Sequence, residues 1–216
     1  MSDMRYFGAY LRFTCKDKKN IGLMLGADTL VGNTVSLSFR QEEESPDPVC
    51  WVKNKFDADL GTFSSRDTYR LNVMQANGWN LYAALATVGF TENADDGFYW
   101  GDVAVVACPP AYSSETEVFF NGVCEKLASG VRPDLELVSS SVDTMLAAKG
   151  NWLPQKQLPL EKKKGEAVVK SKMSASEKAI EQGRKGNIGC YVISWLFIIA
   201  LVAGAGYLAA KMFGLL

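Results

Sequence analysis

The chain has 216 residues, of which 23 are Lys or Arg and 24 are Asp or Glu, so its formal net charge is −1 at pH 7. It has no His, the commonest general base and metal ligand, and its five scattered Cys never form the CxxC spacing of a zinc site. These features count against an enzyme and predict a protein without a metal or cofactor.

The N-terminal part of the chain is rich in strand signals. Residues 5–15 and 33–41 have the β-branched and aromatic composition of strands, and in the second run Val35, Leu37 and Phe39 alternate with polar neighbours. The residues between the two runs are ambiguous between helix and strand. Two strands are therefore predicted before residue 42.

An acidic turn, EEESPDP, separates these runs from a predicted hairpin of strands 49–52 and 59–63. A short helix that begins at a serine is expected over 64–78, and two long strands are expected at 79–90 and 102–108. Five or six short strands with one helix between the fourth and fifth predict a small β-barrel with one inserted helix.

The order of these elements is similar to that of a known domain. A strand ending in Arg40, an acidic turn with an Asp-Pro, a Leu-Gly strand, a short helix, GWNLYAALATVGF and WGDVAVVACPP follow one another. This order resembles the HIRAN domain, a small β-barrel, over residues 33–110. Gly61 stands where that family has the glycine of its GYLP segment, and Asp47 where it has the aspartate of its NPYD turn. The three residues before Asp47 depart from that turn, because Glu, Ser and Pro stand in place of Asn, Pro and Tyr.

The resemblance implies recognition of single-stranded DNA, including a free 3′ end, by aromatic and polar side chains beside the turn that holds Asp47. Such binding needs aromatic faces on which bases stack and cations that contact phosphates. The candidates from the hairpin and the adjoining helix are Trp51, Lys53, Lys55, Arg66, Tyr69 and Arg70. The alternative interpretation places Trp51 and Tyr69 in the barrel core and the cations on a solvated face. Residues 1–154 carry thirteen Lys or Arg against twenty Asp or Glu, so nucleic-acid binding would depend on a local patch.

Two helices are predicted after the strands, over 114–130 and 132–150. The first has Ser114 and Glu117 at capping-box spacing, and the second has Pro133 in its first turn. We expect this helical hairpin to pack on the barrel and cover an edge of its sheet. The alternative is a groove that accepts a helix of a partner.

A charged linker is predicted over 155–187, where nine Lys or Arg face four Glu. Prolines favour an exit from the folded domain near Pro154, and Ser174 with Glu177 forms a capping box that begins a short helix. The cations expected to contact anionic lipid headgroups are Lys162, Lys163, Lys164, Arg184 and Lys185. The alternative is a disordered spacer that adds solubility.

Residues 188–210 carry no charge, and as a helix they would measure about 34 Å, enough to cross a hydrocarbon core. The excess of cations before this segment places the N-terminal domain in the cytoplasm, at the inner membrane if the organism is bacterial. The sequence therefore predicts a tail-anchored, single-pass protein whose residues 188–210 contact membrane lipids. Small residues in this segment are spaced for a helix homodimer: Ala200, Gly204, Gly206 and Ala210.

The sequence as a whole predicts an α+β fold with a β-barrel over 1–110, a helical hairpin over 111–154, a linker over 155–187 and a transmembrane helix over 188–210. The expected function is a non-enzymatic, membrane-tethered recognition module that binds single-stranded nucleic acid or another extended ligand through the barrel. The alternative is a membrane scaffold that binds protein partners through the hairpin and the transmembrane helix.

Overall fold

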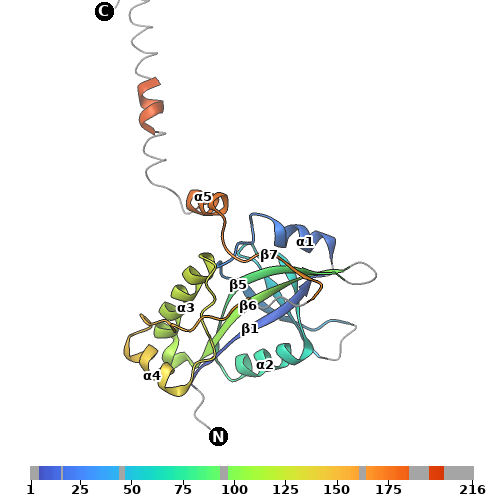
Figure 1. Ribbon diagram of the computed structural model, residues 1–216, viewed down its shortest axis with the longest axis vertical. Coiled ribbons are helices and arrows are strands. Elements are labelled where there is room, and N and C mark those ends of the chain that lie inside the picture. Colours follow the sequence, from blue (N-terminus) through green and yellow to red (C-terminus); the bar gives the residue numbers. More distant parts are fainter. Residues whose placement is uncertain are drawn as a thin grey trace, which may run out of the picture. The chain divides into compact units, whose positions relative to one another are not determined.

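The computed structural model describes residues 5–15, 17–43, 47–92, 97–160, 164–184 and 195–201. The chain divides into a first compact unit that ends at Met173 and a second that begins at Ser174. The sheet and both apolar cores belong to the first unit (Figure 1). This unit extends past the boundary that the sequence predicts near Pro154.

Seven antiparallel strands of the described residues form one sheet in the order β2-β3-β4-β1-β6-β5-β7. Their bounds are β1 Phe7–Cys15, β2 Ser36–Arg40, β3 Val49–Lys53, β4 Asp59–Phe63, β5 Asn80–Thr91, β6 Phe98–Cys108 and β7 Glu166–Lys170. The long strands β1, β6 and β5 are adjacent, and β1 pairs with β6 along its whole length. The six strands predicted in the first half of the chain are confirmed to within a few residues.

Side chains alternate between the two faces of the sheet, and each face has its own core. The inner face carries Phe7, Phe13 and Leu85, all buried. The outer face carries Ala104 and Val106, also buried. A β-bulge in β5 between Leu85 and Thr87 shifts the register against β6 by one residue, so the strand changes its alternation there.

Two helices pack against the inner face. Helix α1 (Lys18–Leu25) begins after Asp17, whose side chain caps the N–H of Lys19, and it occupies the region that the sequence left ambiguous. Helix α2 (Ser65–Ala76) begins after Ser64, whose hydroxyl accepts from the N–H of Asp67 at 3.2 Å. The helix expected over 64–78 is thus confirmed. Figure 1 shows α2 and α3 on different sides of the central strands.

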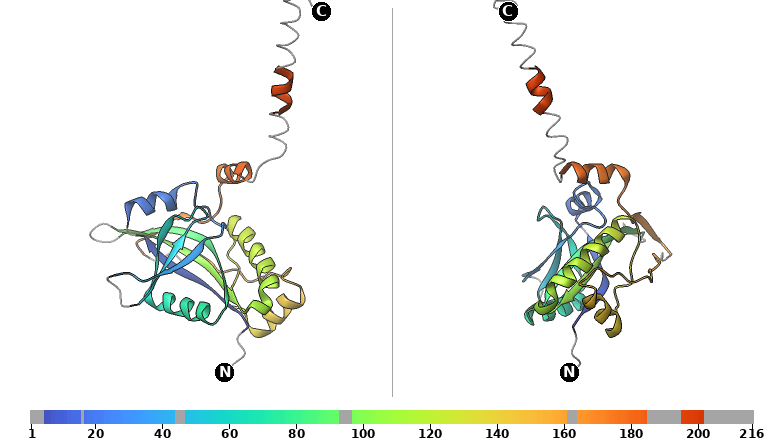
Figure 2. Two further views of the ribbon diagram at one scale, coloured as in Figure 1. Left: turned by 180° about the vertical axis from the view of Figure 1, so that it is seen from behind. Right: turned by 90° about the vertical axis from the view of Figure 1, so that its left-hand side faces the viewer.

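The outer face is covered by helices α3 (Ser113–Ala128) and α4 (Ser139–Ala147), and the short helix η1 (Pro110–Tyr112) precedes α3 in the chain. Helix α3 lies beside the sheet (Figure 2) and buries Phe119, Phe120 and Val123 in the outer core. The predicted capping box is wrong, because the Ser114 hydroxyl donates to Glu115 and the residue before α3 makes no side-chain cap.

The second predicted helix, over 132–150, is wrong in its first half. Residues 132–138 are extended, Pro133 forms a bridge with Gln157, and the N–H of Asp134 donates to the carbonyl of Lys156 at 3.0 Å. Backbone pairing with the segment after α4 satisfies groups that a helix would otherwise satisfy internally. The expected helical hairpin is therefore α3, an extended segment and the shorter α4.

The predicted closed barrel is also wrong, because the sheet is open between its end strands. Residues just before β2 bond to β5: Val35 N–H donates to Ala83 O at 2.9 Å and Leu85 N–H donates to Asn33 O at 3.0 Å. Beyond Val35, β2 pairs with β3 alone among the described residues. The sheet is strongly curved, but β2 diverges from β5 before a barrel wall is complete.

The predicted linker contains the seventh strand. β7 pairs antiparallel with β5 from Val88↔Lys170 to Thr91↔Glu166, so this part of the linker belongs to the sheet. In the second unit, helix α5 (Ala175–Arg184) has the predicted capping box, with Ser174 N–H donating to Glu177 Oε2 at 2.8 Å. Three of the predicted lipid-contacting cations lie outside the described residues, namely Lys162, Lys163 and Lys185.

Across the residues that the structure describes, no helix has the length and apolar character that crossing a membrane requires. This finding contradicts the predicted transmembrane helix and the tail-anchored, single-pass topology derived from it. Of the segment 188–210, only 195–201 are described, and they are helical. The remainder, with Gly204, Gly206 and Ala210 of the expected dimer contact, lies outside the described residues.

Candidate functional site

The predicted site residues lie on different sides of the sheet. On β3, Cys50 and Val52 are buried in the inner core, so the alternate residues Trp51 and Lys53 face outward. Helix α2 buries Leu71 and other residues against the inner face. The structure therefore separates the outward residues of β3 from the residues of α2.

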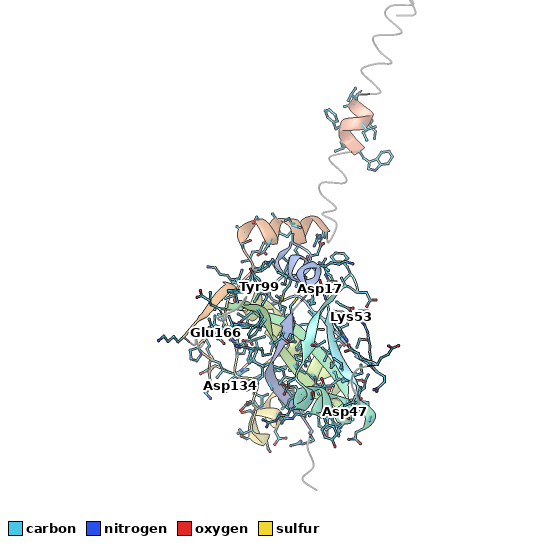
Figure 3. The ribbon with its side chains drawn as sticks, turned by 90° about the vertical axis from the view of Figure 1, so that its right-hand side faces the viewer. Asp17, Asp47, Lys53, Tyr99, Asp134 and Glu166 are labelled. Atoms are coloured by element: carbon cyan, nitrogen blue, oxygen red, sulfur yellow. The ribbon has the colours of Figure 1, made fainter. Side chains whose placement is uncertain are left out.

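The remaining predicted residues do not join Trp51. On α2, Tyr69 is 72% exposed, and the Arg70 guanidinium lies 4.3 Å from the ring centroid of Phe7. Arg66 is exposed on the same helix, as is Lys55 in the turn between β3 and β4. Asp47 is exposed before β3, at the end of the strand opposite to Lys53 (Figure 3). The predicted set is therefore spread over β3, the turns on either side of it and α2.

Carboxylates of the chain engage the polar groups around Trp51. The indole N–H donates to Glu42 Oε1 at 2.7 Å, and Lys53 Nζ lies 2.5 Å from Asp57 Oδ1. Arg40, whose guanidinium lies 5.5 Å from the Trp51 ring, donates to both oxygens of Asp59 at 2.8 and 2.9 Å. The hydrogen bond from Arg40 lowers the pKa of Asp59. A phosphate would have to displace these carboxylates, so this face does not form a cationic groove.

A different feature lies where β2 diverges from β5. The N–H of Val35 and the N–H of Leu85 point across the narrow junction between the two chain segments. Backbone direction alternates along a strand, so the N–H and C=O groups of Leu37 and Phe39 point the same way as those of Val35. They have no partner within the described chain, because β3 pairs with the other edge of β2. We call this feature the β2–β5 opening.

Apolar side chains flank the β2–β5 opening. Leu37 and Phe39 from β2 and Leu81 from β5 are half-buried and pack against the inner core. Trp79, just before β5, is half-buried in the same core. The opening thus combines an unpaired strand edge with side chains that are not fully covered. Alternation at 35, 37 and 39 indicates which side chains face inward, but nothing local in the sequence marks the divergence of the two strands.

Nucleophilic and metal-binding chemistry is weakly represented in the described part of the chain. Burial raises the pKa of the Cys50 and Cys124 thiols to about 12 and that of Cys15 to about 11, so these thiols are neutral near pH 7. Among the same residues, no group of three or more His, Cys, Asp or Glu side chains is placed to hold a metal ion.

No protein-family model and no curated protein matches this chain. The HIRAN resemblance consequently stays a prediction, and the function has to be argued from the geometry of the chain itself.

Proposed function

We propose that this protein is a non-enzymatic recognition module that binds an extended peptide at the β2–β5 opening. The observation that carries the proposal is the unpaired backbone edge of Leu37 and Phe39, which lies beside their own half-buried side chains. An exposed strand edge is a template for an added strand, and main-chain hydrogen bonds then supply much of the affinity.

The geometry of β2 sets the pattern expected in the peptide. Alternate residues of an added strand would lie on the same side as Leu37 and Phe39 and would contact these residues and Leu81. The residues between them would face outward beside Ser38 and Arg40 of β2. Apolar residues at every second position are therefore favoured in the ligand.

Charge favours a basic peptide over a nucleic acid. The acidic turn that follows β2 contains Glu42, Glu43 and Asp47, and residues 1–154 have a net charge of about −7 from thirteen Lys or Arg and twenty Asp or Glu. A phosphate backbone would be repelled by such a surface, whereas Lys or Arg in a peptide would be attracted. We expect cations at the peptide positions nearest the end of β2.

The proposal is tested by selecting short random peptides on the full-length protein and measuring the affinity of the selected sequences by calorimetry. Each peptide is then resynthesised with N-methyl groups on one or the other alternating set of backbone amides. Only one set of amides in an added strand faces β2, so one methylated form should lose at least about tenfold in affinity and the other should bind normally.

Two variants at one position separate backbone from side chain. Phe39→Pro removes the backbone N–H that faces the β2–β5 opening, whereas Phe39→Ala retains this N–H and removes only the ring. The proline variant should therefore bind the peptide more weakly than the alanine variant. Circular dichroism checks that both variants fold. Equal sensitivity to methylation of both amide sets would exclude strand addition. Tight binding of a short oligothymidine with a steep salt dependence would instead favour nucleic-acid recognition.

A further inference from the structure

A cavity of about 490 Å³ lies on the outer face of the sheet, between β1 and the two extended segments 132–136 and 158–160. Its polar lining consists of Tyr10, Arg12, Asp102, Arg132 and Glu136. The volume is in the range of pockets that bind small molecules. No residue of the β2–β5 opening lines this cavity, so an inference drawn from it is independent of the proposed peptide binding. Figure 3 shows Glu166 and Asp134, which lie on the cavity's side of the unit, away from Lys53.

Arg12 is held in one orientation by three contacts. Its Nε donates to Asp102 Oδ1 at 3.1 Å, its Nη1 donates to Glu166 Oε1 at 2.7 Å, and its guanidinium lies 3.5 Å from the ring centroid of Trp100. Trp100 is fully buried, so the surface beneath the guanidinium is rigid. The other terminal nitrogen, Nη2, has no hydrogen-bond partner in the described chain and remains available to a ligand.

Arg132 is a buried cation with incomplete hydrogen bonding. Its side chain is 13% exposed, and its Nη1 donates to Thr87 Oγ1 at 2.5 Å and to Asp102 Oδ2 at 3.3 Å. Its Nε is buried without a partner, and Asp102 is shared with Arg12. Burying a guanidinium costs free energy when the carboxylate that pairs with it is shared with a second guanidinium. An anion bound next to Arg132 would offset that cost.

The rest of the lining limits the kind of anion. Leu135, Leu158 and Leu160 form an apolar wall, and the Tyr10 hydroxyl donates to the carbonyl of Pro133 at 2.9 Å. Asp102 and Glu166 already balance the two guanidinium charges, and the exposed Glu136 adds a negative charge to the lining. The site therefore offers unpaired guanidinium donors rather than net positive charge, and a single carboxylate fits it better than a dianion. We propose that the cavity binds a monocarboxylate with a short apolar body, whose carboxylate contacts Arg132 and Arg12 and whose body packs against the leucines.

The test titrates hexanoate, hexanol and hexylamine separately into the full-length protein and follows binding by calorimetry. The three probes share one apolar chain and differ in the charge of the head group. Hexanoate should bind at least about tenfold more tightly than hexanol, because hydrogen bonds to a charged group are lost with the alcohol. Hexylamine should bind more weakly than hexanoate, because an ammonium group cannot accept a hydrogen bond from either guanidinium.

Variants then locate the site. Arg132→Gln should weaken hexanoate binding by about tenfold, whereas Arg40→Gln, on the other half of the sheet, should leave it unchanged. Equal affinity for hexanoate and hexanol, no hexanoate binding up to about 10 mM, or full binding by the Arg132 variant would each overturn the proposal. If Arg132→Gln fails to fold, the comparison of hexanoate with hexanol on the natural protein still decides.

Discussion

At the scale of single residues, the central strands use glycine to make room for aromatic rings. A Cβ added at Gly89 of β5 would come within 2.2 Å of the Trp100 ring, and one added at Gly101 of β6 would come within 2.4 Å of the Phe13 ring. Both rings are fully buried, so neither can move aside. Trp100 can therefore lie flat on the sheet and support the guanidinium of Arg12.

We expect Gly89→Ala to destabilise the fold by about 2 kcal/mol or more, because the methyl group overlaps a buried ring in a packed core. Chemical denaturation measures the change. Gly22→Ala is the matched control, because its added Cβ would have no atom within 4 Å apart from its chain neighbours and the backbone of α1 itself. Alanine in α1 should stabilise the fold by about 0.5–1 kcal/mol. A neutral result for Gly89→Ala would mean that Trp100 has freedom to shift.

At the scale of elements, side chains anchor β7 at both of its ends. Glu166 contacts Arg12, and Lys170 Nζ donates to the carbonyls of Gly26 at 2.8 Å and Thr29 at 3.2 Å. These contacts join the last strand to β1 and to the loop after α1. A short edge strand is otherwise marginal, so its side-chain anchors should govern how often it detaches.

Lys170→Met removes the ammonium group that bonds the two loop carbonyls and should let β7 open more often. Hydrogen exchange of the amides of 88–91 should then accelerate, while the amides of β1 that pair with β6 should exchange as before. Lys172→Met, which changes an exposed lysine two residues later, serves as the control. Unchanged exchange at 88–91 would show that backbone pairing alone holds β7.

The ion pair of Arg40 and Asp59 joins β2 to β4 across β3 and predicts a pH dependence. Arg40 lowers the folded-state pKa of Asp59, so the pair adds stability above the unfolded pKa of about 3.9 and loses it as the pH falls through the lower folded value. The advantage of the natural protein over Arg40→Gln should be constant near neutral pH and should shrink below about pH 4.

Both side chains of this pair are about a third exposed, so the difference in unfolding free energy at pH 7 should stay below about 1 kcal/mol. Urea denaturation at a series of pH values gives the comparison, and Arg66→Gln on α2 should show no such trend. A difference that stays undiminished at pH 3 would assign the effect to packing of the Arg40 side chain rather than to its charge.

At the scale of the whole molecule, local patterns predicted elements better than their assembly. Alternation and capping identified the strands of the first half and helix α2, because both signals lie within the element itself. β7 was missed because five residues in a lysine-rich stretch carry little pattern, and residues 132–138 were misassigned because pairing with the segment at 156–158 overrides local helix signals.

The candidate sites show the same limit. The sequence left open whether Trp51 lies in the core or on the surface, and its outward direction on β3 is a finding of the structure. The carboxylates beside it come from other segments of the chain. Arg12 and Arg132 are far apart in the sequence and meet only because both contact Asp102 on β6. No spacing rule detects such a pair, and none detects the divergence of β2 from β5.

The bulge in β5 has a consequence for how this protein tolerates insertions and deletions. Ala86 and Thr87 both lie on the outer side of the sheet. Ala86 belongs to the outer core, and the Thr87 hydroxyl accepts from Arg132. Loss of one of them would leave a single outward residue between Leu85 and Val88, so β5 would pair with β6 without a bulge and Val88 and Gly89 would keep their sides and partners. A deletion at this point would therefore be absorbed locally, at the cost of one outward contact, whereas a deletion in the regularly paired part of β5 would exchange inside for outside along the strand.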